Sequence, residues 1–262
     1  MRRVVIGLLV LVGLLVAVDY GSAALAESAV SRQMREQIGL ADDPSVRING
    51  FPFLTQAVSG HYRSIDVDAT RIRLGQLQEL DVSAQLRDVT APLSMILGSG
   101  PKTLRVSEAE GTVRVSATDV QRLLPGIKDL RIDTLDDEAL EQVVDDGGDA
   151  SLADLDPDHA ARFSGTATFL GQKEDVSVIA VLQLDSGQAE IIPRDIRLGE
   201  DQKPLPQAQQ RTLQQLFTVR IDPGSLPLQI TPTSLKADNG TLEISGEAKD
   251  LTLGAGGAPA SS

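Results

Sequence analysis

Residues 65–89, IDVDATRIRLGQLQELDVSAQLRDV, indicate the fold class, because apolar and polar side chains alternate along most of this stretch. A period of two is typical of strands that bury one face and expose the other. The alternation slips by one residue between Ala69 and Ile72, and again between Leu86 and Val89. Because such a slip moves later side chains to the opposite face, each slip predicts a β-bulge or a bend in the strand. We therefore expect bent strands in a strongly curved sheet.

Further alternating segments lie at residues 104–106, 113–115, 163–169, 176–184 and 242–248. The Glu-Ala-Glu-Gly sequence at 108–111 is expected to form a turn between the first two, and residues 171–174 are expected to separate the next pair. Asp238-Asn239-Gly240 offers residues that tolerate positive φ, which predicts a tight hairpin turn before the last strand.

Helices are expected to be few and short outside the N-terminus. One is predicted at 53–58, because Pro52 suits a first turn and Gly60 suits an end. A second is predicted at 119–124, with Thr118 as its cap. A third is predicted at 207–217, and a short one around 93–97.

The N-terminus carries an export signal. Val4 to Val18 is an unbroken apolar run behind two arginines, and as a helix it would span about 22 Å, short of a full hydrocarbon core. Ala24-Leu25-Ala26 fits a signal peptidase site, so residues 1–26 are interpreted as a signal peptide. The apolar spacing nevertheless continues at helical period to Ile38, which fits a retained signal anchor equally well. Both alternatives place the rest of the chain outside the cytoplasmic membrane.

The exported part is predicted to be a single domain at 27–253, followed by a disordered Gly-, Ala-, Pro- and Ser-rich tail at 254–262. The formal net charge is −13, and residues 133–158 contain eleven acids and no Lys or Arg. We interpret this acidic segment as an insertion within the domain. Leu135, Leu140 and Val143-Val144 offer the apolar residues of a short helix, but residues 145–149 are expected to form a mobile loop. Nucleic acid is excluded as a partner class, because the chain lacks a basic footprint. There is no cysteine, which excludes disulfides, thiol catalysis and lipid attachment through cysteine.

The sequence gives no sign of catalysis or of a cofactor. It has two histidines: His61 is expected in a polar turn, and His159 in the acidic loop or before a strand. The nucleophile, zinc-protease, phosphate-loop and dinucleotide motifs are absent. Asp154, Asp156 and Asp158 have the spacing of a calcium loop but lack its glycine and distal glutamate, so we expect a solvated acidic loop and no metal site. The chain is therefore not expected to be an enzyme.

The apolar residues are mostly aliphatic, since aromatics make up 3% of the chain and Trp is absent. Such a composition fits an ordinary aliphatic core. It fits equally well a channel whose walls accept acyl chains.

One motif is more specific. Residues 46–56, VRINGFPFLTQ, are followed by Gly60-His61-Tyr62 and by the strand at 65–67. Together with Ile221-Asp222-Pro223, the proline-rich segment at 226–233 and residues 240–246, they resemble the LmeA family. The resemblance covers roughly residues 20 to 253, and G-F-P-F-L-T-Q is its most specific element.

The resemblance implies an α+β fold of the TULIP or BPI-like type, in which a strongly curved antiparallel sheet wraps a long helix around an apolar cavity. It implies a non-enzymatic, periplasmic phospholipid-binding protein that prefers anionic lipids such as phosphoinositides and supports the synthesis of lipid-linked mannans. The expected partners are phospholipid, the membrane surface and an envelope enzyme that makes glycolipids. The alternative function is a scaffold that assists such an enzyme, with the acidic segment contacting a basic partner.

The site residues fall into two groups. Lipid contact is predicted for Phe51, Phe53, Leu54, Leu213, Leu216 and Phe217. Pro52 stiffens the corner that presents the first three, so they either gate lipid entry or plug the end of a core. Head-group contact is predicted for Arg47 and Arg63, since arginine suits phosphate. His61, Arg71 and Arg73 are weaker candidates, and a solvated outer face explains most of these cations equally well.

Overall fold

The computed structural model describes residues 2–74, 77–92, 94, 103–124, 126–169, 172–185, 188–199, 203–205, 210–211, 219–221 and 231–253. Its helices are α1 (Arg2–Ile38), α2 (Phe53–Ser59), α4 (Ala117–Leu123) and α5 (Asp137–Asp145), with 3-10 turns η1 (Ala150–Leu152) and η2 (Pro157–His159). Its strands are β1 (Ser45–Asn49), β2 (His61–Leu74), β3 (Leu77–Thr90), β4 (Leu104–Ser116), β5 (Ile127–Asp133), β6 (Ala160–Phe169), β7 (Gln172–Asp185), β8 (Gln188–Leu198), β9 (Lys203–Pro204), β10 (Val219–Ile221), β11 (Thr231–Asp238) and β12 (Thr241–Leu253).

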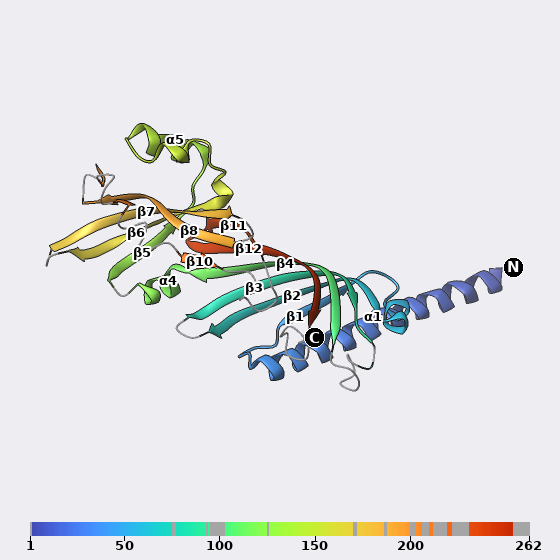
Figure 1. Cartoon of the computed structure of the whole chain (residues 1–262). Helices are drawn as coiled ribbons and strands as arrows, with labels where there is room; N and C mark the ends of the chain where they lie inside the picture. The colour runs from blue at the N-terminus through green and yellow to red at the C-terminus, as the bar shows by residue number, and fades with distance from the viewer. Residues whose placement is uncertain are drawn as a thin grey trace. The chain divides into compact units, whose positions relative to one another are not determined.

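The strands form two antiparallel sheets, which confirms the α+β class (Figure 1). One sheet has the order β1-β2-β3-β4-β12-β11, and the other has the order β10-β8-β7-β6-β5 with β9 paired to β8. Both orders end in edge strands, so neither sheet closes into a barrel over the described residues. The sheets are also not strongly curled, so the expectation of a strongly curved sheet is not met. The helix wrapped by the sheet and the apolar cavity stay predictions.

The backbone departs from regular strand geometry at both slips, in agreement with the expectation of a bulge or bend. Strands β2 and β3 each run unbroken through the point where the apolar pattern slips. Arg71 has φ 55° and Asp88 has φ 49°, values that ordinary strand residues do not adopt. A similar irregularity occurs in β5, where Asp129 has φ 53° and the register with β6 shifts. The slips in the sequence thus mark residues that leave the pleat without ending the strand.

The predicted turn at 108–111 is wrong, because β4 passes through it as a continuous strand. Ala109 is buried, and Glu110 forms an ion pair with Arg87 of β3 at 2.9 Å. The predicted separation at 171–174 is also mostly wrong, since β7 starts at Gln172 and pairs it with Phe169. Both clusters resemble turns in the local sequence, but pairing with the neighbouring strands keeps them extended.

The hairpin turn after Asp238 is confirmed. Asp238 pairs with Thr241, while Asn239 and Gly240 have φ values of 48° and 79°. Two positive φ values are the signature of a type I′ turn, whose twist matches that of the flanking strands.

The short-helix predictions have mixed outcomes. Helix α2 ends with Gly60 in the left-handed region, as expected. Helix α4 is confirmed, but its cap is Ser116, which accepts a hydrogen bond from Asp119 N, and not Thr118. The helices predicted at 207–217 and 93–97 lie largely outside the described residues.

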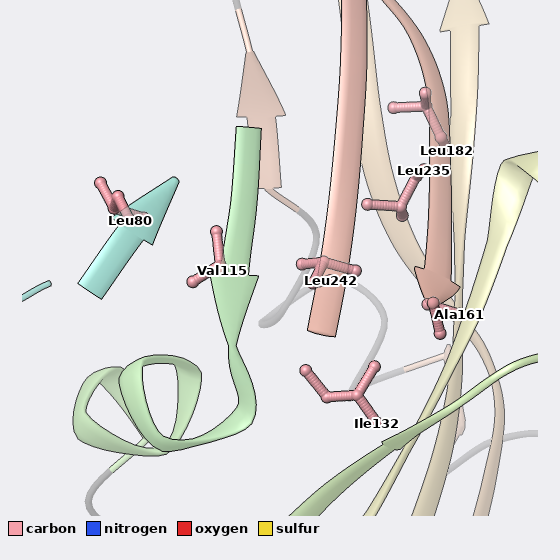
Figure 2. Packing of buried hydrophobic residues seen from close by; sticks show 8 residues of the cluster. Leu80, Val115, Ile132, Ala161, Leu182, Leu235 and Leu242 are labelled. Carbon is pink, nitrogen blue, oxygen red and sulfur yellow. The ribbon is translucent and has the colours of Figure 1, made fainter. Parts of the chain in front are cut away.

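The chain forms two compact units whose boundaries fall within long strands. Unit 1 comprises residues 1–70, 83–110 and 248–262, and unit 2 comprises residues 71–82 and 111–247. Figure 2 shows the core of unit 2, where side chains from both sheets meet. The members of this core are Leu80, Val115, Ile132, Ala161, Leu182, Leu235, Ala237 and Leu242. They are all aliphatic, as the composition predicts.

The acidic segment is folded. Helix α5 forms at the apolar residues that offer a short helix, whereas the loop predicted at 145–149 is hydrogen-bonded back to α5, which corrects the expectation of a mobile loop there. Leu135, Leu140, Val143 and Leu152 are buried in one cluster against the sheet residues Ala160, Ile179 and Val181. Its aspartates act as caps: Asp136 accepts from Ala139 N, Asp149 from Ser151 N and Asp156 from Asp158 N. The free energy gained by burying the apolar side chains outweighs the repulsion between the carboxylates, because most of the acidic side chains remain exposed to solvent.

Candidate functional site

Helix α1 changes character at residue 19. Residues 2–18 are exposed apart from half-buried Val16, and among the described residues α1 alone is long and apolar enough to cross a membrane. Beyond this point Asp19, Ala23, Ala26 and Val30 recur every three or four residues and are buried or half-buried. The second half of α1 is therefore a packed, amphipathic helix of unit 1.

Asp19 connects α1 to the G-F-P-F motif. Its side chain is 5% exposed, and its two carboxylate oxygens accept hydrogen bonds from Phe53 N and Leu54 N, both at 2.8 Å. Helix α2 needs this partner, because its N-cap position is Pro52, whose side chain provides no capping bond. A carboxylate from α1 thus performs the capping that the local sequence cannot.

Gln56, the last residue of the motif, fixes the turn that precedes α2. Its side-chain nitrogen donates to Gly50 O at 3.0 Å and to Asn49 O at 3.3 Å, while its oxygen accepts from Arg63 N at 3.0 Å. Gly50 has φ +104°, so a residue with a side chain would be strained there. The buried amide therefore joins β1, the turn and β2 into one corner.

The three apolar motif residues are placed differently. Phe53 is buried at the start of α2, so the plug interpretation fits its position. Phe51 and Leu54 are 53% and 40% exposed, and the Phe51 ring stacks on Tyr20 of α1 with 6.1 Å between ring centroids. The corner thus holds one phenylalanine inside and presents the other two side chains to the surroundings.

The two predicted head-group residues, Arg47 and Arg63, lie in unit 1, whereas the weaker candidates are divided between the units. Arg63 lies beside the motif, since a Cβ added at Gly50 would stand 3.5 Å from its side chain. Arg47 is exposed on β1, in register with Asp66 of β2. His61 begins β2 rather than occupying a turn, and its Nε2 is 3.7 Å from Asp88. Arg71 and Arg73 belong to unit 2.

Tyr62 is fully buried next to this corner. Within the described part of the chain, its hydroxyl has no hydrogen-bond partner. Burial raises the pKa of this phenol above its ordinary value of 10.0. The neutral ring therefore acts as an apolar filler at the start of β2.

Sequence reasoning missed the capping role of Asp19 and the bridging role of the Gln56 side chain, although Gln56 lies within the motif at 46–56. The available signal for Asp19 was a lone carboxylate that ends a long apolar run, a position where an uncompensated charge is costly. Leu213, Leu216 and Phe217 lie outside the described residues. Over the ranges that the structure covers, no group of three or more His, Asp or Glu residues is arranged to hold a metal ion.

The arrangement is suited to contacting apolar ligands and anions. It combines exposed apolar side chains with a neighbouring arginine on a corner that buried polar groups hold in place. A sequence profile described as LmeA-like phospholipid-binding matches residues 17–247. No curated protein and no solved structure matches the chain.

Proposed function

The chain belongs to the LmeA-like phospholipid-binding family, and from this membership we propose that it binds phospholipid at the outer face of the cytoplasmic membrane without catalysing a reaction. The observation that carries this proposal is the corner at residues 50–56. Asp19 and Gln56 hold in place the corner on which Phe51 and Leu54 are exposed, and Arg63 lies beside Gly50 of the same corner. An exposed apolar pair next to a cation fits a molecule with acyl chains and a phosphate.

The acyl chains are proposed to lie against the apolar face of β1 and β2. Val46 pairs with Val67 and Ile48 with Ile65, so the four side chains share one face. Val46 and Ile48 are buried, whereas Ile65 and Val67 are half-buried. Incomplete covering of aliphatic side chains leaves apolar surface for a hydrocarbon chain to bury. The enclosed, TULIP-like cavity is part of this proposal.

The head group is proposed to be anionic, of the phosphoinositide class, and to meet Arg63 first and Arg47 second. Both arginines are exposed, and a guanidinium can offer two parallel hydrogen bonds to one phosphate. Export to the periplasm and support of lipid-linked mannan synthesis complete the proposed role, on the strength of the family resemblance.

The direct test is to extract lipid from the purified full-length chain and identify it by mass spectrometry. The chain should be made in a host whose envelope contains phosphoinositides. The expected result is anionic phospholipid enriched over its share of the host membrane. The matched control is the Phe51→Ser, Leu54→Ser double variant, which keeps α1 and therefore keeps the lipid that surrounds any membrane helix. Equal lipid content and composition in both proteins would contradict the proposal.

The head-group assignment has its own comparison. Arg63→Ala should lower the enrichment of anionic lipid several-fold, whereas Arg105→Ala, an exposed arginine on β4, should leave it unchanged. Equal enrichment in both variants would remove Arg63 from the site.

The alternative function is an interaction protein, and one observation favours it. Helix α5 exposes a row of acids, namely Asp137, Glu138, Glu141 and Asp145. These side chains are suited to a basic partner. Replacing Asp137, Glu138 and Glu141 with the corresponding amides leaves the buried apolar cluster intact. A lipid carrier should keep its lipid after this change, whereas a scaffold should lose its partner.

A further inference from the structure

Three polar contacts join the second half of α1 to the body of unit 1. Besides the Asp19 cap, Glu27 accepts a hydrogen bond from Ile48 N at 2.7 Å, and the Ser31 hydroxyl donates to Pro44 O at 2.6 Å. Strand β1 is an edge strand, so the Ile48 N–H points away from β2 and needs such a partner. Cleavage after Ala26 would remove Asp19 and leave the first N–H groups of α2 uncapped.

An apolar patch lies where α1 leaves the folded unit. Its four members are Tyr20, Phe51, Leu54 and Val58, with exposed fractions of 65%, 53%, 40% and 86%. Phe51 stacks on Tyr20, and Leu54 and Val58 are one turn apart on α2. Helix α2 contains no charged residue. We call this set the interfacial patch.

The patch directly follows the apolar run along α1. Residues 2–18 extend past α2 toward the N-terminus in Figure 1, and Asp19 and Tyr20 come next. The 15 apolar residues from 4 to 18 span about 22 Å as a helix, less than a hydrocarbon core of about 30 Å. A short span draws the following residues close to the bilayer surface. Tyrosine is enriched at that depth, where its ring is apolar and its hydroxyl is wet.

We propose that α1 is retained as a membrane anchor and that the interfacial patch docks on the outer leaflet of the same bilayer. Asp19 has two roles in this arrangement. It ends the membrane-spanning run, and it fixes α2 beside that end, so Phe51, Leu54 and Val58 meet the interface together. Positive charge at Arg2 and Arg3 keeps the other end of α1 on the cytoplasmic side. The occupant of the patch is therefore lipid of the anchoring membrane.

The proposal does not require a bound lipid in the domain. A chain from which no lipid is extracted can still dock the interfacial patch on the bilayer. A chain that carries bound lipid can equally leave the patch exposed to water. The two proposals thus fail under different results.

The absence of cysteine allows a site-specific test. Val58→Cys and Leu123→Cys are introduced singly into the full chain and labelled with the fluorophore NBD. Leu123 is the control, because it is an exposed leucine on α4 of unit 2. Both proteins are reconstituted into vesicles of phosphatidylcholine and phosphatidylglycerol. Quenching is then measured with nitroxide lipids labelled near the head group and with aqueous iodide.

The label at residue 58 is expected to be blue-shifted, to be quenched by the shallow nitroxide lipid, and to be protected from iodide several-fold relative to the label at 123. Equal iodide quenching at both positions would overturn the docking claim. The mass of the intact protein from an envelope-competent host tests retention. A mass that includes residues 2–26 supports the anchor, and a chain that begins at Glu27 overturns the proposal.

Discussion

Replacing Asp19 with alanine tests whether a carboxylate of α1 organises the corner at residues 50–56. The change removes both acceptors of the first two N–H groups of α2, at 2.8 Å each, in a place that is 5% exposed. Loss of an N-cap costs about 0.5–2 kcal/mol, and hydrogen bonds to a charged group contribute about 1.5–3 kcal/mol. Because Pro52 provides no substitute cap, we expect α2 to lose about 2–3 kcal/mol of local stability.

The assay is hydrogen–deuterium exchange of the full chain in detergent micelles, read at the amides of α2. A loss of about 2–3 kcal/mol corresponds to exchange about 30- to 150-fold faster when α2 opens locally. Asp19→Asn keeps one acceptor oxygen and should show an intermediate rate. The control is Asp43→Ala, which removes an exposed ion pair with Arg35 on the same helix and should change stability by about 0.5 kcal/mol or less. Exchange in α2 that is equal in Asp19→Ala and Asp43→Ala would refute the reasoning.

Three further changes test other parts of the structure. Leu140→Ala should lower the free energy of unfolding by about 3 kcal/mol and speed proteolysis of residues 133–158, because the side chain is buried in the cluster under α5; an unchanged digestion pattern would restore the mobile loop. Tyr62→Phe should cost little stability at neutral pH, because the hydroxyl has no hydrogen-bond partner among the described residues. The raised pKa keeps the folded phenol protonated above pH 10.0, where the unfolded phenol ionises, so wild-type stability should fall there more steeply than that of the variant. Parallel curves of stability against pH would contradict this. Gly165→Ala should destabilise by about 1–3 kcal/mol, because its Cβ would lie 2.9 Å from Ile127, whereas Gly126→Ala meets nothing within 4 Å; equal melting temperatures would show that the bulge tolerates a side chain.

The sequence predicted features that depend on a residue's own pattern. The strand irregularities at Arg71 and Asp88 appear in the sequence as slips of the apolar period. The Asn239-Gly240 turn follows from residues that accept positive φ. The end of α2 at Gly60 has the same origin. Each of these depends on backbone conformations that few residue types adopt, so short stretches of sequence are sufficient.

Features that depend on distant partners were not predictable in this way. Glu110 looks like a turn residue, but β4 runs through it as a continuous strand between β3 and β12, with the neighbouring Ala109 buried. The high charge of the acidic segment favours a loop, but its few leucines and valines pack against residues of the sheet, which the local sequence does not reveal. Asp19 is separated by 34 residues from the amide of Phe53, so nothing near either residue reveals the contact. The contacts of Asp19 are of this long-range kind, whereas those of Gln56 reach only six or seven residues along the chain.

The most direct measurement of the central claim, that the corner at residues 50–56 contacts phospholipid, is photocrosslinking. The full chain is reconstituted with a phospholipid that carries a diazirine on its acyl chain, and the adducts are mapped by mass spectrometry. We expect adducts on residues 51–58, in addition to those on residues 2–18 that any membrane helix would acquire, and fewer adducts at 51–58 in Asp19→Ala. Adducts confined to residues 2–18 would show that the corner does not contact phospholipid.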